Sequence, residues 1–186
     1  MGPVNKRRQA DKLTGPAPVN LQKKLMKKLM VSLGLLVIGL AVNAQNGPKG
    51  LNVNDKAPGF SAKDQAGKTV SLNEQLKTGA VVLLFYRGQW CPYCNRQLKN
   101  LEDSLSLITA RGATLIAVTP EKPENINKTI EKTKATYPVL FDDGLKIMKS
   151  YDVAFAVDPD VIKKYKGYGI DFSEVNGNNG AQLPVP

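Results

Sequence analysis

Two strongly apolar segments, the first of them unbroken, dominate the pattern of hydrophobic and polar positions. Residues 80–86 and 113–118 are rich in β-branched and aromatic side chains, which predicts two strands buried on both faces of a parallel sheet. Between them, apolar residues recur at three- and four-residue steps and predict one helix from Pro92 to Arg111-Gly112; they are Leu98, Leu101, Leu105 and Ile108. This alternation predicts an α/β fold with parallel strands and right-handed crossovers.

Shorter elements flank this centre. Residues 58–64 are predicted to be extended, and residues 69–72 to form a strand edge after a turn. Ser71, followed three residues later by Glu74, is a capping-box pattern and predicts a short helix to about residue 77. Farther on we expect a polar helix over 125–135, a short strand over 137–141 and a short helix over 145–151. The chain after about residue 156 has no clear period.

The N-terminal segment has the three parts of an export signal. A basic cluster at residues 23–28 precedes an apolar run over 29–42, which ends in small side chains at Ala44. The run is shorter than the roughly 20 residues that a membrane span needs, so we expect cleavage after Ala44; the alternative is an uncleaved membrane anchor. Met26 begins a complete signal peptide over 26–44, and residues 1–25 are predicted to be a disordered basic extension. Export would place the chain in a periplasmic or other extracytoplasmic compartment, where disulfides persist.

Composition excludes several classes of site. The chain has 186 residues, which suffices for one domain over 45–186 after the signal, and it contains no histidine. It can therefore build neither a Ser-His-Asp or Cys-His nucleophile nor a His-ligated metal site, and two cysteines cannot close a four-ligand zinc site. The net charge of +10 comes mostly from residues 1–44. In the predicted domain basic and acidic side chains are interleaved, so we expect no nucleic-acid binding.

The Cys91-Pro92-Tyr93-Cys94 segment carries the strongest chemical signal. It directly follows a predicted buried strand and begins a predicted helix, and Pro92 suits the first helical position. Cys91 would then lie at a helix N-terminus, where free N–H groups and the helix dipole favour a thiolate and lower its pKa. We therefore predict Cys91 as the nucleophile. Cys94, one turn further and less exposed, is predicted to be the resolving thiol that forms a redox disulfide with Cys91.

Two residues before the pair are expected to support it. Trp90 would shield the Cys91 sulfur from water, and Arg87 lies near enough in the sequence to support a thiolate electrostatically. One structural alternative is an inert disulfide, but such a bridge closes only a tiny loop and restricts the unfolded chain little. The other is half of a metal site, for which the sequence offers no second ligand pair.

The active segment and several others resemble a known family. Residues 85–98, with Arg87-Gly88-Gln89-Trp90 before the cysteines, resemble the peroxiredoxin-like branch of the alkyl hydroperoxide reductase/thiol-specific antioxidant (AhpC/TSA) family. Weaker matches occur in the same order along residues 51–186; they are Ala57-Pro58, Asp64, Gly67-Lys68, Arg111-Gly112-Ala113, Val118-Thr119-Pro120, residues 137–143, Asn176-Gly177 and residues 183–186. The resemblance implies a thioredoxin-like fold with three α/β/α layers.

The resemblance also implies an activity. Cys91 would be the peroxidatic cysteine that attacks hydrogen peroxide or an organic hydroperoxide and becomes a sulfenic acid. Cys94 would condense with it to a disulfide, which a thioredoxin-type donor would reduce. Arg87, Trp90, Pro92 and Tyr93 are then supporting residues. No metal or cofactor is expected, a homodimer is compatible with the resemblance, and membrane contact is expected only through an uncleaved signal segment.

Two features depart from typical members. Leu84 and Gly88 stand where such members carry a proline and a threonine or serine. Residues 183–186 resemble a segment that leads, in the family, into a core strand, a partner strand and a final helix. We therefore expect a domain that lacks these C-terminal strands and helix, that leaves residues 80–86 as an exposed sheet edge, and that folds poorly alone.

Two further functions stay open. The first is an exported thiol:disulfide oxidoreductase that uses the Cys91–Cys94 pair without touching peroxide, because Cys-Pro-Tyr-Cys also occurs in glutaredoxins. The second is an interaction domain without catalysis, which a lack of any thiolate at neutral pH would indicate.

Overall fold

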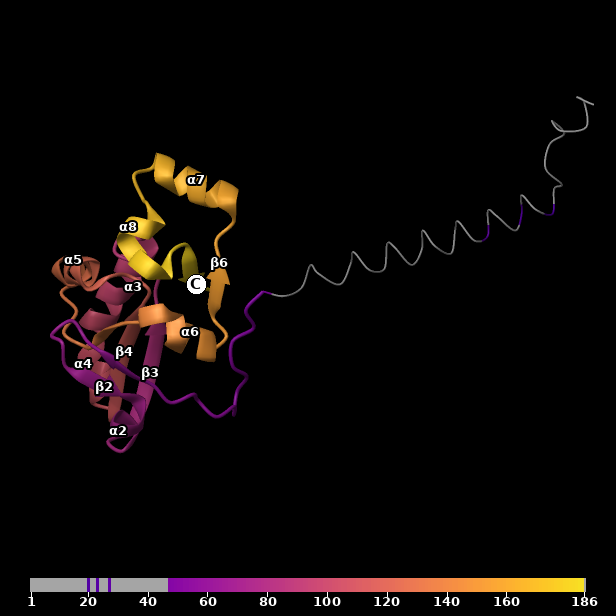
Figure 1. Cartoon of the computed structure of the whole chain (residues 1–186). Coiled ribbons are helices and arrows are strands. Elements are labelled where there is room, and N and C mark those ends of the chain that lie inside the picture. Colours follow the sequence, from indigo (N-terminus) through magenta and orange to yellow (C-terminus); the bar gives the residue numbers. More distant parts are fainter. Residues whose placement is uncertain (1–19, 21–22, 24–26, 28–46, 186) are drawn as a thin grey trace, which may run out of the picture. The chain divides into compact units, whose positions relative to one another are not determined.

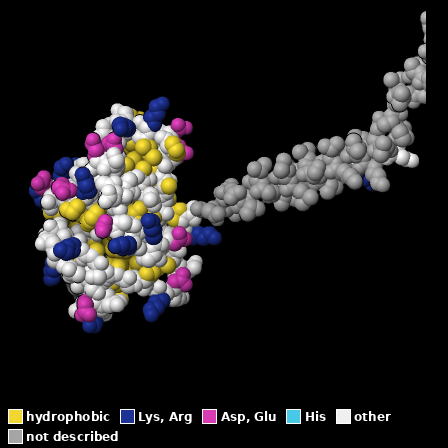
Figure 2. Space-filling view, viewed as in Figure 1, with side chains coloured by type: hydrophobic (Ala, Val, Ile, Leu, Met, Phe, Trp, Pro, Cys, Tyr) yellow, Lys and Arg dark blue, Asp and Glu magenta, His cyan; other side chains and the backbone are white. Residues whose placement is uncertain are grey.

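The computed structural model describes residues 20, 23, 27 and 47–185. Residues 20 and 23 belong to the predicted extension, and residue 27 belongs to the predicted signal segment. The rest of both segments and the predicted cleavage site after Ala44 lie outside the described residues. Within the described part of the chain, no helix has the length and apolar character needed to cross a membrane. Figure 2 shows basic and acidic side chains mixed over one face of the domain, as the interleaved sequence predicts.

A parallel sheet of three strands forms the centre of the domain. The strands are β3 (Ala80–Phe85), β4 (Ala113–Thr119) and β5 (Val139–Phe141), and β4 lies in the middle. Ala80 pairs with Ala113, and Ala117 pairs with Val139. The predicted α/β fold with parallel strands is therefore confirmed (Figure 1).

Alternate side chains of β4 supply two separate cores. Leu115 and Ala117 pack with side chains of α3 (Pro92–Asp103) and α5 (Pro123–Thr133). Ile116 and Val118 pack on the other face of the sheet, with side chains of α6 (Lys146–Ser150). Because successive strand residues point to opposite faces, the consecutive apolar residues Leu115–Val118 serve both cores. The domain thus has the three predicted layers.

β3 differs from the prediction of burial on both faces. It occupies an edge of the described sheet, and Val82 is 41% exposed. Ala80 is exposed too, whereas Leu83, Leu84 and Phe85 are partly buried. The reason is that, among the described strands, β3 pairs only with β4. No described strand lies along the other edge of β3, so its side chains have neighbours from an adjacent strand on one side only. β3 is thus the expected edge of the described sheet, but Tyr86 is buried and exposure is confined to Ala80 and Val82.

An antiparallel hairpin precedes the sheet. Its strands are β1 (Ser61–Lys63) and β2 (Thr69–Ser71), and α2 (Leu72–Leu76) follows at once. The predicted short helix is therefore present, but the Ser71 side chain makes no capping hydrogen bond. The capping-box prediction is wrong in this detail.

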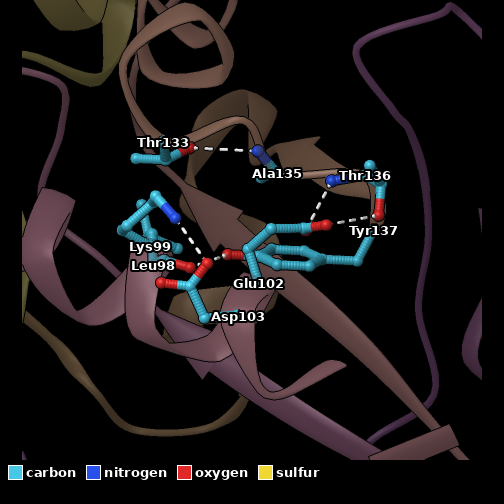
Figure 3. A network of polar contacts seen from close by, with 8 residues as sticks. All are labelled: Leu98, Lys99, Glu102, Asp103, Thr133, Ala135, Thr136 and Tyr137. Carbon is cyan, nitrogen blue, oxygen red and sulfur yellow. Dashed lines mark hydrogen bonds and ion pairs between the residues drawn. The ribbon is translucent and has the colours of Figure 1, made fainter. Parts of the chain in front are cut away.

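The long helix predicted after the cysteines is interrupted. α3 ends at Asp103, and a second helix, α4 (Leu105–Thr109), begins after Ser104, which has a non-helical ψ of 2°. A polar network fixes this end of α3 to the chain that enters β5 (Figure 3). Glu102 accepts hydrogen bonds from the N–H and hydroxyl of Thr136 at 2.7 and 2.9 Å, and the buried Tyr137 hydroxyl donates to the Leu98 carbonyl at 2.9 Å. These hydrogen bonds join the helix that follows Cys91 to the segment that enters the sheet.

The C-terminal part holds elements that the sequence pattern did not predict. β6 (Ala154–Ala156) and β7 (Gln182–Pro184) form an antiparallel pair. Between them lie α7 (Pro159–Gly167), α8 (Phe172–Asn176) and the 3-10 turn η4 (Gly177–Asn179), with α7 and α8 side by side in Figure 1. Their apolar side chains form a third cluster around the buried residues Val157, Phe172 and Leu183.

Candidate functional site

The local sequence places Cys91 at the beginning of α3. Cys91 is the N-cap residue, with extended φ and ψ of −87° and 109°, and Pro92 occupies the first turn as predicted. The Cys91 Sγ accepts a hydrogen bond from the Cys94 backbone N–H at 3.3 Å. A negative sulfur at this point satisfies one of the free N–H groups of the helix and meets the positive end of its dipole.

The two sulfurs are 2.7 Å apart, and the Cys94 thiol donates to Cys91. Both cysteines are free in this structure. Cys91 is the more buried residue at 8% exposure, and Cys94 is half-buried. The prediction that Cys94 is the less exposed is therefore wrong, because Cys91 lies where the loop meets the helix, whereas Cys94 lies one turn along α3. Small movements would close a disulfide between them.

The surroundings shift the pKa values of the two thiols in opposite directions. The hydrogen bond from the Cys94 thiol, the backbone N–H groups of Cys94 and Tyr93, and the charge of Arg87 lower the pKa of Cys91 to about 6 against an opposing effect of burial. The same thiol hydrogen bond, together with burial, raises the pKa of Cys94 well above its ordinary value. These shifts favour the thiolate form of Cys91 and the thiol form of Cys94; the roles of nucleophile and resolving thiol stay predictions.

Arg87 and Tyr93 line the same cavity as Cys91. The Arg87 Nε donates to the Pro184 carbonyl at 3.4 Å, and its guanidinium lies 5.7 Å from the Phe155 ring centre. Tyr93, 76% exposed, extends into solvent beside Arg96, whose guanidinium lies 5.8 Å from its ring centre. Arg87 thus anchors the loop to the β6–β7 pair and supports the thiolate electrostatically, as predicted.

Trp90 joins the loop to the C-terminal helices. Its ring makes edge contacts with Tyr165 of α7 and Phe172 of α8, at centroid distances of 5.3 and 5.6 Å. Shielding of the Cys91 sulfur by Trp90 stays a prediction. What the contacts establish is a mechanical role, because the indole fixes the residue just before Cys91 to a separate part of the fold.

A cavity opens beside the thiols. Its volume is about 240 Å³, and residues of β3, the loop, α3 and the C-terminal segment line it; they are Leu84, Phe85, Tyr86, Arg87, Cys91, Tyr93, Cys94, Gln97 and Val185. The wall is mostly apolar, and Arg87 contributes the cationic group. Such a cavity suits a small molecule with an apolar body and one polar, reactive end.

Glu121 is a site residue that the sequence pattern did not indicate. It follows β4 and is fully buried, and its Oε2 accepts a hydrogen bond from the Gln89 backbone N–H at 2.8 Å. Lys132 of α5 donates to the carbonyl of the same Gln89, at 3.2 Å. A usable signal existed: Glu121 and Cys91 both come just after parallel strands that are neighbours, and the carboxyl ends of such strands meet at one edge of the sheet.

The Glu121 carboxyl explains why position 88 is a glycine. A Cβ at Gly88 would lie 2.5 Å from the Glu121 Oε1 and 2.6 Å from the Trp90 Nε1, and the backbone φ there is +152°. The space above the loop is already filled by these two side chains. A threonine or serine at this position, as in typical members of the family, is therefore incompatible with the arrangement seen here.

The acidity of Cys91 leads to a testable pH dependence. Its thiolate is the form with the lowered pKa, so thiolate is complete well above pH 6 and is lost as the pH falls through about 6. We expect the ultraviolet absorbance of the thiolate in the reduced protein to titrate with a midpoint near pH 6. Cys94→Ala should raise the midpoint, because it removes the largest cause of the lowered pKa. A wild-type midpoint near the ordinary value of 9.0 would contradict this assignment.

Among the described residues, no group of three or more His, Cys, Asp or Glu side chains is placed to hold a metal ion. The structure brings together the thiol pair, the cavity and the two nearby side chains Arg87 and Glu121. Their arrangement is that of a thiol redox site.

Comparison with known proteins agrees with this chemistry. The chain is 31% identical over 103 residues to chloroplastic peroxiredoxin Q of Populus jackii, covering 55% of this chain and 48% of the relative. It is 26% identical over 100 residues to the thiol-disulfide oxidoreductase ResA of Halalkalibacterium halodurans, covering 53% and 56%. It thus spans about half the length of these relatives.

A solved structure supports the fold. The crystal structure of peroxidoxin BcpB from Mycobacterium tuberculosis superposes with a TM-score of 0.53 at 22% identity, over 60% of this chain and 70% of that one. At this identity the likeness concerns the fold, which is thioredoxin-like. The model of the AhpC/TSA family matches residues 53–168, more than half of the chain. The chain therefore belongs to the AhpC/TSA family.

Proposed function

We propose that the chain is a thiol peroxidase that reduces hydrogen peroxide or an organic hydroperoxide. The observation that carries the proposal is the acidic Cys91 thiol in the wall of a mostly apolar cavity, with the Arg87 guanidinium in the same wall. The apolar wall suits the organic group of a hydroperoxide. The guanidinium can stabilise the negative charge that develops on the leaving oxygen.

The proposed reaction has two steps. In the first, the Cys91 thiolate attacks the terminal peroxide oxygen: an S–O bond forms, the O–O bond breaks, and the departing alkoxide or hydroxide takes up a proton. Cys91 is thereby oxidised to a sulfenic acid and the peroxide is reduced to an alcohol or water. In the second, the Cys94 sulfur displaces the hydroxyl group from Cys91, which leaves as water, and a disulfide forms. The sulfur distance of 2.7 Å favours this second step.

A second candidate is thiol:disulfide exchange without peroxide chemistry. The identity of 26% with ResA and the adjacent pair of an acidic and a weakly acidic thiol favour it. In that reaction Cys91 would attack a disulfide of a partner and Cys94 would release the partner in reduced form.

One kinetic experiment separates the two candidates. Trp90 is the only tryptophan in the chain and directly precedes Cys91, so its fluorescence should report oxidation of the thiols. The fully reduced protein would be mixed with hydrogen peroxide, with an aromatic hydroperoxide, or with a small model disulfide. We expect at least one peroxide to react about 10³-fold faster than it does with free cysteine. If both peroxides react no faster than with free cysteine while the disulfide reacts rapidly, the exchange function is correct.

A thioredoxin-like protein is the proposed reductant of the Cys91–Cys94 disulfide. Tyr93 lies between the two cysteines and is 76% exposed, so a partner that reaches the disulfide would have an aromatic ring to pack against. Export of the chain, cleavage after Ala44 and formation of a homodimer stay predictions.

A further inference from the structure

The inference concerns Glu121, a buried acid that the two-step reaction does not use. Its side chain has no exposed surface, which is rare for a carboxylate unless it is paired. One oxygen accepts from the Gln89 N–H at 2.8 Å, and the other, Oε1, has no hydrogen-bond partner among the described residues. The carboxyl is therefore held in place by the loop that leads to Cys91, with capacity for a further proton or donor.

Other polar atoms around this carboxyl are also buried and without partners among the described residues. The Trp90 Nε1 is one of them, and together with the Glu121 Oε1 it lies within 2.6 Å of the Cβ position of Gly88. The hydroxyl of Tyr86, the residue that follows β3, is another, and Glu121 is one of the charges that raise the pKa of Tyr86. Buried groups of this kind are costly to keep, so their presence beside a reactive thiol calls for a functional explanation.

Charged and titratable groups act on Glu121 from α5, from the beginning of α3 and from the end of β3. Lys128 and Lys132 come from α5, Cys91 comes from the beginning of α3, and Tyr86 directly follows β3. The two lysines favour the ionised carboxylate, whereas burial and the Cys91 thiolate oppose it. Burial, the largest of these causes, raises the pKa of Glu121 to about 7, in the range where Cys91 itself titrates.

The influence of Cys91 on Glu121 must be reciprocal. A negative charge on one group disfavours a negative charge on the other, so the two titrate as a coupled pair. When Cys91 is a thiolate, Glu121 is held more strongly in its protonated form. When Cys91 enters a sulfenic acid or a disulfide, its charge disappears, and Glu121 then releases a proton more readily.

We propose that Glu121 is a positioning residue of the thiol site: it holds the loop at Gly88–Trp90, and its carboxyl releases a proton when Cys91 is oxidised and takes one up when Cys91 is reduced to the thiolate. This rests on the proposed function only in taking Cys91 as the reacting thiol. The proton count is consistent, since peroxide attack removes one thiolate charge from the site and the departing alkoxide or hydroxide needs one proton.

Glu121→Gln tests the proposal, because glutamine has the same shape and its carbonyl can still accept from Gln89. Glu124→Gln is the matched control: the same change at an exposed position three residues along the chain. The thiolate absorbance of Cys91 would be titrated in the reduced wild type and both variants. In Glu121→Gln we expect a single-site curve whose midpoint is lower by about half a pH unit, a threefold higher ratio of thiolate to thiol. We expect Glu124→Gln to match the wild type.

A Glu121→Gln curve that superimposes on the wild type would overturn the proposal. If this variant does not fold, ¹³C NMR of the glutamate carboxyl groups in the wild type gives the same answer. The pKa of the one buried glutamate should be lower in the oxidised than in the reduced protein, and equal values would overturn the proposal. Neither measurement uses peroxide, so a failure of the proposed peroxidase function would not be mistaken for a failure of this inference.

Discussion

Cys91→Ser is expected to reduce the rate of peroxide consumption by at least about 10³-fold, because an alcohol at this position does not ionise near neutral pH and cannot replace the thiolate. The structure provides the reason for the size of the effect. The sulfur at position 91 is the atom that accepts both the Cys94 N–H and the Cys94 thiol hydrogen, and of the two thiols only Cys91 has a lowered pKa. The measurement is steady-state loss of hydrogen peroxide with a thiol reductant present.

Cys94→Ser is the informative companion. It should leave the first oxidation intact and stop the reaction after about one equivalent of peroxide, because the sulfenic acid on Cys91 then has no resolving thiol beside it. The serine hydroxyl can still donate to the Cys91 sulfur, so the acidity of Cys91 should change less than in Cys94→Ala. Equal activity of Cys91→Ser and the wild type would remove Cys91 from the mechanism, and full turnover by Cys94→Ser would remove Cys94.

Gly88→Ala is expected to lower the free energy of unfolding by about 3 kcal/mol, a decrease of roughly 10 °C in the thermal midpoint. The new Cβ would lie 2.5 Å from the Glu121 Oε1 and 2.6 Å from the Trp90 Nε1. Neither neighbour can retreat easily, because the carboxyl accepts from Gln89 and the indole is packed between Tyr165 and Phe172. The loop itself would have to move, and with it the Cys91 N–H that donates to the Gly88 carbonyl at 3.0 Å.

Gly67→Ala is a control that separates the steric effect of the new Cβ from the effect of the backbone conformation. Gly67 also has a positive φ, of +76°, but a Cβ there would have no heavy atom within 4 Å. In this control the free energy of unfolding should fall only by the cost of the unfavourable backbone conformation, about 1 kcal/mol. Thermal unfolding of the two variants and the wild type, followed by circular dichroism, makes the comparison. Equal losses at the two positions would show that Glu121 and Trp90 do not occupy the space above Gly88.

The centre of the fold was predictable because local pattern and tertiary environment agree there. Residues 115–118 of β4 are all apolar and are covered on both faces, and the Cys91-Pro92 junction has the residues that a helix start requires. β3 has the same kind of sequence but lies at an edge, which a pattern of apolar residues cannot reveal because it does not say which strands are neighbours. The interruption of the helix at Ser104 was not predicted for a similar reason, because the stripe of apolar side chains continues across it.

The C-terminal helices are short and half-buried, so their apolar residues do not form a long periodic stripe. Their start signals were nevertheless present. Asp158 precedes Pro159 and its carboxylate accepts the Asp160 N–H at 2.8 Å, and Asp171 caps α8 in the same way at 3.0 Å from Ser173. The role of Glu121 depends on a contact 32 residues away, with Gln89. Only the folded chain brings these two together.

The attachment of the C-terminal helices has a consequence for local unfolding. Trp90 packs on α7 and α8, and the end of α8 is bonded to the chain around Glu121: the Lys122 N–H and the Asn125 side-chain amide both donate to the Val175 carbonyl, at 3.0 Å each. If these helices detach, the indole loses its partners and the carboxyl of Glu121 gains access to water. The thiol loop and the α7–α8 segment should then open and close as one cooperative unit, with a single free energy of opening that is smaller than that of the central sheet.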